Sequence, residues 1–140
     1  MSKIAVVFWT GTGNTLAMAE AVAAGAKEKG AEVVTFGPTE FTKEKVNEFD
    51  AIAFGCPAMG AEVLEEMEFE PMFSDVEKSL QGKRIAIFGS FGWGDGLWMR
   101  DWEERCRLAG ANLVSEGVMA NGMPGDSEIA ECKKLGAMLL

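Results

Sequence analysis

The stretch FWTGTGNTLAMAE, residues 8–20, joins an apolar run to a segment with helical spacing through a turn rich in glycine and threonine. A turn between a strand and a helix can hold a phosphate, because the free N–H groups at the start of the helix point toward the anion. Residues 10–15 contain neither lysine nor arginine. The stretch therefore predicts an anion site that is built from uncharged donors.

Apolar runs along the rest of the chain predict the fold. Strand-like runs occupy residues 3–9, 31–36, 50–56, 83–89 and 112–120, and helix-like segments occupy 14–29, 42–48, 65–80, 97–108 and 127–140. Three of the runs are almost continuously apolar, as in a parallel sheet that is covered on both faces. The alternation predicts an α/β fold, a doubly wound five-stranded parallel sheet with helices on both faces. We expect residues 1–140 to form a single domain.

Composition restricts the classes of function. The chain of 140 residues has a formal net charge of −9 and no histidine. Such a surface repels nucleic acids and anionic membranes and attracts basic partners, and the commonest metal ligand is absent. No segment resembles a signal peptide or reaches the roughly 18 apolar residues of a membrane-spanning helix. We therefore expect a cytoplasmic protein with no metal site and with reduced, buried thiols at Cys56, Cys106 and Cys132.

Unusual loops follow the first, third and fourth strand-like runs, at residues 10–15, 56–62 and 90–96. In a parallel sheet these loops lie at the same edge, where the strands end. If the strand order is 2-1-3-4-5, the three strands are neighbours and the loops meet where the winding reverses. Open α/β sheets bind their ligands at that crevice.

The first loop, TGTGNT, matches neither of two common phosphate motifs. GxxxxGK(S/T) requires a lysine, and GxGxxG requires a glycine where this chain has Leu16. Hydroxyl and amide donors remain, together with glycines that let the backbone wrap tightly. A permanently bound monophosphate needs donors rather than a cation, whereas a capped turn without a ligand would need fewer of them. The residues are Thr10, Gly11, Thr12, Gly13, Asn14 and Thr15.

The second loop, CPAMGAE, combines a stiff start with a flexible centre. Pro57 restricts the chain after the strand, and Gly60 permits a positive φ. Met59 offers a polarizable side chain that can lie on the face of a ring. The alternative is an ordinary strand-to-helix turn in which Met59 belongs to the core.

The third loop, SFGWGDG, places Trp93 between Gly92 and Gly94. An indole without packing neighbours is poorly explained as core and well explained as the wall of a site for a flat ligand. Trp98 and Trp102, in contrast, have helical spacing and are expected in the core. A phosphate cradle and two walls for a ring together favour FMN as the cofactor and electron transfer as the chemistry.

The segments TGTGNT, GCPAMGAEVLEE, EFEP and GSFGWGDGLWMRDWEERC resemble the flavodoxins, in particular the short-chain type of anaerobic bacteria. The resemblance covers essentially the whole chain and implies the strand order 2-1-3-4-5. It also implies that the long insertion that splits the fifth strand in long-chain members is absent.

The resemblance implies a role for each loop. The first loop would bind the FMN phosphate, which Ser90 would also approach. Met59 would cover the inner face of the flavin and Trp93 the outer face. Glu62 would accept a hydrogen bond from the flavin N3–H, and the Gly60–Ala61 peptide would turn on one-electron reduction. The expected cofactor residues are Thr10, Gly11, Thr12, Gly13, Asn14, Thr15, Pro57, Ala58, Met59, Gly60, Ala61, Glu62, Ser90, Phe91, Gly92, Trp93 and Gly94.

Three residues depart from the pattern of the family. Ala61 stands where members often carry Asp, Ser or Asn, which bears on the stability of the semiquinone. Pro57 replaces a hydroxyl residue that can contact the phosphate, and Phe91 replaces the usual Tyr. None of these changes alters the expected cofactor.

The predicted function is that of a low-potential one-electron carrier whose bound FMN shuttles between semiquinone and hydroquinone. We expect no enzymatic activity. Residues 61–77 contain no basic residue and seven acidic ones, which are Glu62, Glu65, Glu66, Glu68, Glu70, Asp75 and Glu77. This charge would lower the potential of an anionic hydroquinone and steer basic-surfaced redox proteins toward the flavin. We expect a monomer.

Other functions of the same fold remain as alternatives. One is an FMN protein that activates a single partner enzyme, and it would differ from a carrier in its range of partners. Another is an FMN-dependent reductase, which Trp93 over the exposed ring face argues against. A receiver-type signalling domain is excluded, because Trp9 and Thr10 stand where that function needs an acidic pair and Cys56 where it needs an aspartate.

Overall fold

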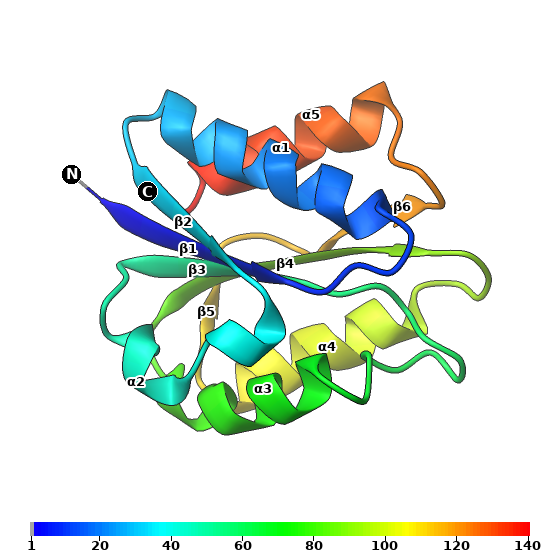
Figure 1. Cartoon of the computed structure of the whole chain (residues 1–140), viewed down its shortest axis with the longest axis horizontal. Coiled ribbons are helices and arrows are strands. Elements are labelled where there is room, and N and C mark those ends of the chain that lie inside the picture. Colours follow the sequence, from blue (N-terminus) through cyan, green and yellow to red (C-terminus); the bar gives the residue numbers. More distant parts are fainter. Residues whose placement is uncertain (1) are drawn as a thin grey trace.

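The computed structural model describes residues 2–140 and has one parallel sheet in the order β2-β1-β3-β4-β5, as predicted (Figure 1). β6 continues along the same side of β4 as β5. The carboxyl ends of β1, β3 and β4 meet at one edge, because Phe8 pairs with Gly55 and Gly55 with Phe88. The strands are β1 (Lys3–Phe8), β2 (Glu32–Phe36), β3 (Ala51–Gly55), β4 (Arg84–Phe91), β5 (Asn112–Leu113) and β6 (Val118–Asn121).

The fifth strand is interrupted, in contrast to the single run expected over residues 112–120. β5 and β6 both pair with β4, but the residues between them leave the ladder. The N–H of Gly117 donates instead to Oε2 of Glu103 in the neighbouring helix, at 2.7 Å. A Cβ on Gly117 would overlap the side chain of Met99. The close approach of the helix therefore replaces ladder hydrogen bonds at this point.

The helices cover both faces of the sheet (Figure 1). One face carries α1 (Asn14–Glu28) and α5 (Asp126–Ala137), and the other carries α2 (Lys43–Val46), α3 (Phe69–Val76) and α4 (Leu97–Leu108). Short 3₁₀ turns span Pro38–Glu40 and Glu77–Ser79. Gly30, Gly82 and Gly110 follow helical turns with φ values of 90°, 75° and 79°, as their positions predicted.

Helix α3 begins later than the expected residue 65. Pro71 has no N–H, and in a helix interior its ring would collide with the carbonyl group four residues earlier. Starting the helix at Phe69 puts Pro71 in the first turn, where no N–H is needed. Residues 65–68 form a turn that leads into the helix.

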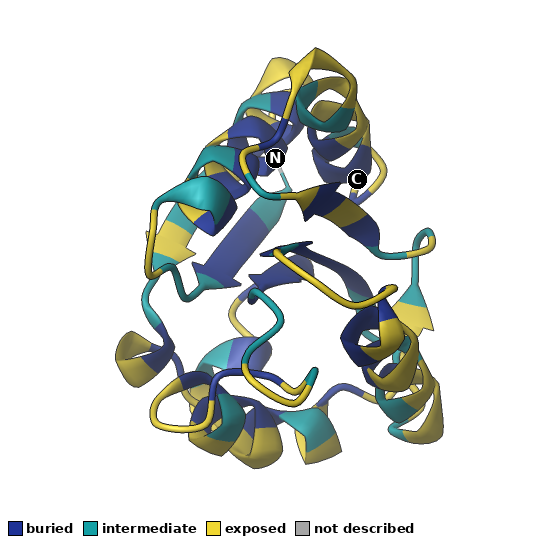
Figure 2. Cartoon of the chain, turned by 90° about the vertical axis from the view of Figure 1, so that its right-hand side faces the viewer, coloured by how far each residue is buried: buried dark blue, intermediate teal, exposed yellow. Residues whose placement is uncertain are grey.

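The core consists of two apolar layers, one on each side of the strands (Figure 2). Trp98 and Trp102 are both buried in the layer under α3 and α4, as predicted. All three cysteine thiols are also buried and free. Among the described residues, no helix is long and apolar enough to cross a membrane.

Candidate cofactor-binding site

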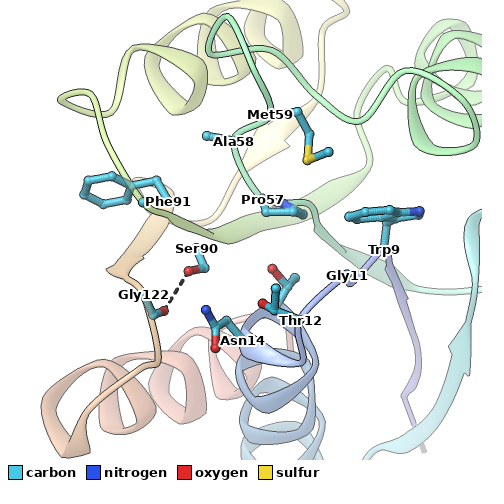
Figure 3. A pocket seen from close by; sticks show the side chains of 12 residues that line it. Trp9, Gly11, Thr12, Asn14, Pro57, Ala58, Met59, Ser90, Phe91 and Gly122 are labelled. Atoms are coloured by element: carbon cyan, nitrogen blue, oxygen red, sulfur yellow. Dashed lines mark hydrogen bonds between the residues drawn. The ribbon is translucent and has the colours of Figure 1, made fainter.

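A cavity of about 310 Å³ opens where β1, β3 and β4 end (Figure 3). Segments far apart in the chain surround it: the turn before α1, the loop after β3, the end of β4 and the turn after β6. Ten predicted cofactor residues line this cavity: Gly11, Thr12, Asn14, Thr15, Pro57, Ala58, Met59, Ser90, Phe91 and Gly92. The fold thus brings together residues from all three predicted loops.

Two lining residues, Trp9 and Gly122, were not predicted. Trp9 follows β1, and its ring lies against the first loop, because a Cβ on Gly11 would be 3.1 Å from its Cη2 atom. Because Trp9 is a large aromatic residue directly before the first loop, its place in the site could have been predicted from the sequence. Gly122 gives no such signal, since backbone contacts tie it to the site: its carbonyl accepts the Ser90 hydroxyl, and its N–H donates to the Phe91 carbonyl at 2.8 Å.

The turn before α1 is shaped by Thr10. Its Oγ1 accepts the N–H groups of Gly13 and Leu16, at 3.1 and 3.4 Å. Gly13 has φ 96°, which a glycine adopts without strain. Thr12 and Asn14 extend toward the cavity (Figure 3). Thr10 and Gly13 therefore form the turn, whereas their neighbours line the space beside it.

Within the described chain, the residue that precedes α1, Gly13, provides no side-chain cap, and the first turn has no acidic residue, although Thr10 Oγ1 accepts the N–H of Leu16. N–H groups at a helix start have no partner within the helix, and the N-terminal end attracts negative charge. With Thr12, Asn14 and Thr15 nearby, this end of the cavity suits a small anion such as a phosphate.

The loop after β3 forms a small closed turn. Met59 and Val63 exchange two backbone hydrogen bonds, with N···O distances of 2.9 and 3.2 Å. Gly60 between them has φ 32°, so the predicted positive φ is confirmed. The N–H of Ala58 donates to the Ser90 carbonyl at 3.0 Å, which joins this loop to the end of β4.

Seven predicted residues do not line the large cavity: Thr10, Gly13, Gly60, Ala61, Glu62, Trp93 and Gly94. Gly60, Glu62 and Trp93 instead border a second space of about 30 Å³, which they share with Met59. Trp93 is 66% exposed, so it does not belong to the core. Ala61 is exposed at the tip of its loop.

Ser90 uses its hydroxyl group within the protein. Its Oγ–H donates to the carbonyl oxygen of Gly122 at 2.7 Å, across the cavity wall (Figure 3). This bond ties the end of β4 to the turn after β6. The donor that the sequence offered to a phosphate is therefore occupied in this structure.

Glu65 anchors the far end of the loop that follows β3. Its buried carboxylate accepts the N–H groups of Met67, Glu68 and Phe69, each at 2.8 Å. Burial by itself would raise the pKa of Glu65, but the three N–H groups favour the carboxylate and hold its pKa below the usual value. Its own N–H donates to Sγ of Cys56 at 3.3 Å. Burial raises the pKa of the Cys56 thiol far above its usual range, so the thiol stays protonated.

The acidic segment 62–77 is partly neutralised from another helix. Arg105 of α4 pairs with Glu70 at 2.6 Å and with Glu77 at 2.8 Å. Asp95 of the third loop pairs with Arg100 at 3.2 Å. Glu65 is buried, so fewer free carboxylates surround the site than the sequence suggested.

Comparison with known proteins identifies the family. A family model for flavodoxin matches residues 6–136. The chain belongs to the flavodoxin family. Flavodoxins are FMN-based electron carriers, and this flavodoxin is 42% identical over 131 residues to one from Clostridium beijerinckii, covering 94% of each chain.

Similarity extends to a second flavodoxin and to its structure. The flavodoxin of Megasphaera elsdenii is 41% identical over 133 residues, which cover 95% of each chain. The solution structure of the two-electron reduced protein superposes with a TM-score of 0.90 over 97% of both chains. An archaeal flavodoxin structure has a TM-score of 0.85 at 29% identity and covers 98% of this chain.

The residues of the cavity fit FMN. At one end, hydroxyl and amide side chains lie beside the start of α1, whose N-cap residue Gly13 provides no side-chain cap. Met59 and Trp93 border the narrow space at the other end. These two ends match a phosphate and a flat ring on one ligand.

Proposed function

We propose that this flavodoxin binds FMN non-covalently in the cavity and carries single electrons between redox proteins. The proposal depends on one arrangement: the start of α1, where Gly13 offers no side-chain cap, lies at a cavity that Met59 also lines, and Trp93 borders the small space that shares Met59 with this cavity. Bound FMN would supply the one-electron chemistry. The chain's own residues would bind it, orient it and control its surroundings.

At the phosphate end, Thr12, Asn14 and Thr15 would donate hydrogen bonds together with backbone N–H groups. Thr10 would act mainly by shaping the turn, because its oxygen already accepts two N–H groups. Ser90 would position the turn after β6 rather than donate to the phosphate. Pro57 supplies no donor, so the first loop would carry most of the binding.

At the ring end, Met59 and Trp93 would cover the two faces of the flavin, and Glu62 would accept its N3–H. Gly60 would let the following peptide turn at little cost, because glycine tolerates both orientations. A carbonyl at this peptide that accepts N5–H would favour the semiquinone. Ala61 keeps the loop tip free of a further charged side chain.

The charges near the ring would affect the reduction potential of the bound flavin and the choice of partner proteins. Among residues 2–140, Glu62, Glu66 and Glu68 form no ion pair. They would disfavour an anionic hydroquinone and so lower the potential at which it forms. The same charges would attract basic-surfaced redox proteins, and salt would weaken that attraction. We propose a monomeric, single-domain carrier that cycles mainly between semiquinone and hydroquinone.

Titration with FMN followed by stepwise anaerobic reduction tests the proposal. We expect one FMN per chain with quenched fluorescence, and a yellow protein that turns blue and then pale. Thr12→Val should weaken FMN binding by about tenfold, as loss of a hydrogen bond to a charged group implies, and should leave riboflavin binding unchanged. Thr35→Val on the outer strand is the matched control. Failure to take up FMN contradicts the binding site, and reduction without a blue stage contradicts the one-electron cycle.

A further inference from the structure

Glu62 has an unusual backbone conformation. Its φ is 56°, and among residues 2–140 Glu62 is the one residue other than glycine with a positive φ. Such a conformation is strained for a side chain with a Cβ, and it persists only where surrounding contacts enforce it. The contacts of the Glu62 side chain are therefore informative.

The Glu62 carboxylate reaches helix α4. Its Oε1 accepts the N–H of Leu97, the first residue of that helix, at 3.2 Å. The preceding residue, Gly96, has no side chain that could cap the helix, and the first turn of α4 contains no acidic residue. Glu62 thus supplies, from the loop after β3, an acceptor that α4 does not provide for itself.

The third loop is shaped around the same carboxylate. Gly94 has φ 89°, and a Cβ at this position would lie 2.6 Å from Oε1 of Glu62. Gly94 is the residue after Trp93. The side chain of Glu62 therefore contacts both the start of α4 and the loop that carries the indole.

We propose that Glu62 and the Leu97 N–H form a positioning pair that couples the loop 57–63 to the loop 91–96. The hydrogen bond holds the carboxylate in one place and ties the two loops to the start of α4, so that they become ordered together. The effect of this coupling on the flavin ring rests on the proposed function. The coupling itself is a property of the protein alone.

Amide hydrogen exchange in the apoprotein tests the coupling without a cofactor. Glu62→Ala removes the acceptor, whereas Glu62→Gln keeps a carbonyl oxygen in its place. We expect the Leu97 amide to exchange about fivefold faster in the alanine variant, the factor that corresponds to one ordinary hydrogen bond, and much less so in the glutamine variant. The amide of Ile129, which bonds to Gly125 in α5, is the internal control. Unchanged exchange at Leu97 in Glu62→Ala overturns the proposal.

Leu97→Pro tests the consequence for binding. Proline is tolerated at the first position of a helix and removes the N–H, together with the partly exposed leucine side chain. Asp126→Pro is the control for a proline at the first residue of a helix, because Asp126 begins α5 and also follows a glycine, which is extended in Gly125 and left-handed in Gly96. We expect Leu97→Pro to weaken FMN and riboflavin by the same factor, about fivefold, and Asp126→Pro to weaken neither. Inorganic phosphate should bind both variants as it binds the parent protein.

A double-mutant cycle separates the pair from a general loss of stability. In the Glu62→Ala background, Leu97→Pro should cause no further weakening of riboflavin binding. An undiminished effect there, or unaltered riboflavin affinity in Leu97→Pro, contradicts the pair. If Leu97→Pro does not fold, the exchange rate of Leu97 in Glu62→Ala decides the proposal alone. If the parent protein binds no flavin, the proposed function fails, and the same exchange rate still decides the coupling.

Discussion

Gly136 of α5 packs directly on the backbone of α1 at Val22, whose carbonyl oxygen a Cβ at position 136 would overlap. Gly25 of α1 meets the Lys133 carbonyl in the same way. The two helices therefore approach more closely than any larger side chain at these positions would allow. Gly25 lies in the interior of α1 and Gly136 in the last turn of α5, and glycine inside a helix is by itself unfavourable.

Gly136→Ala should destabilise the protein, although the same change stabilises an ordinary helix by roughly 0.5–1 kcal/mol. The added methyl group meets rigid backbone, so we expect a loss of about 1–3 kcal/mol in the free energy of unfolding. Urea unfolding of the apoprotein measures it, with Gly25→Ala as a second instance of the same contact. A gain in stability would show that the helices can separate without cost.

Glu65→Gln should destabilise the protein by about 1–2 kcal/mol, because an amide cannot accept all three N–H groups that the carboxylate accepts. Glu66→Gln removes the same charge from an exposed neighbour and should change stability by less than about 0.5 kcal/mol. Chemical unfolding at neutral pH measures both. Equal effects in the two variants would assign the loss to net charge rather than to the buried contacts.

Acid should remove the contribution of Glu65. Its pKa in the folded protein is below the usual value of 4.5, so the unfolded chain binds the proton more readily. The contribution is therefore fully present above about pH 5 and is lost as the pH falls from 4.5 through the lowered pKa. Stability curves between pH 7 and pH 3 should be shallower for Glu65→Gln than for the parent, and parallel curves would contradict the assignment.

Arg105→Met tests the ion pairs between α3 and α4. Methionine keeps most of the contact with Phe73, over which Arg105 lies at 4.9 Å, but leaves Glu70 and Glu77 unpaired. Hydrogen bonds from Arg105 lower the pKa of Glu70, so the pairs stabilise the fold only while that carboxylate is ionised. We expect a loss of about 1 kcal/mol at pH 7, since the pairs are partly exposed, and a progressively smaller loss as the pH falls from 4.5 through the lowered pKa of Glu70. Arg107→Met on the exposed side of the same helix is the control, and a loss independent of pH would point to packing instead.

Trp93→Ala should loosen FMN and restore its fluorescence. Trp93 is 66% exposed, so its removal should alter the stability of the apoprotein by less than about 0.5 kcal/mol. A stacking contact of about 0.5–1.5 kcal/mol corresponds to a rise in the dissociation constant of roughly two- to thirteenfold. Trp93→Phe keeps a ring and should lie between the two. Unchanged affinity and quenching in Trp93→Ala would remove the indole from the proposed site.

Local patterns predicted most of the fold. The helix at residues 97–108 has the predicted bounds, because Trp98, Trp102 and Cys106 recur on one face and all are buried. The loops at 10–15, 56–62 and 90–96 could be placed at one edge because they follow neighbouring parallel strands. Pro71 was a local signal for the later start of α3, and it was missed.

The sequence by itself determined the order of strands and helices, the positions of the turns and the residue types that meet at the sheet edge. These depend on periodicity and turn chemistry, which act over a few neighbouring residues. Only the tertiary structure decided that Gly117 leaves the strand for Glu103, that Arg105 neutralises Glu70, and that Glu62 reaches Leu97. Each of these contacts joins residues 14 to 35 positions apart. Such pairings arise when packed elements bring their surfaces together, and no local pattern encodes them.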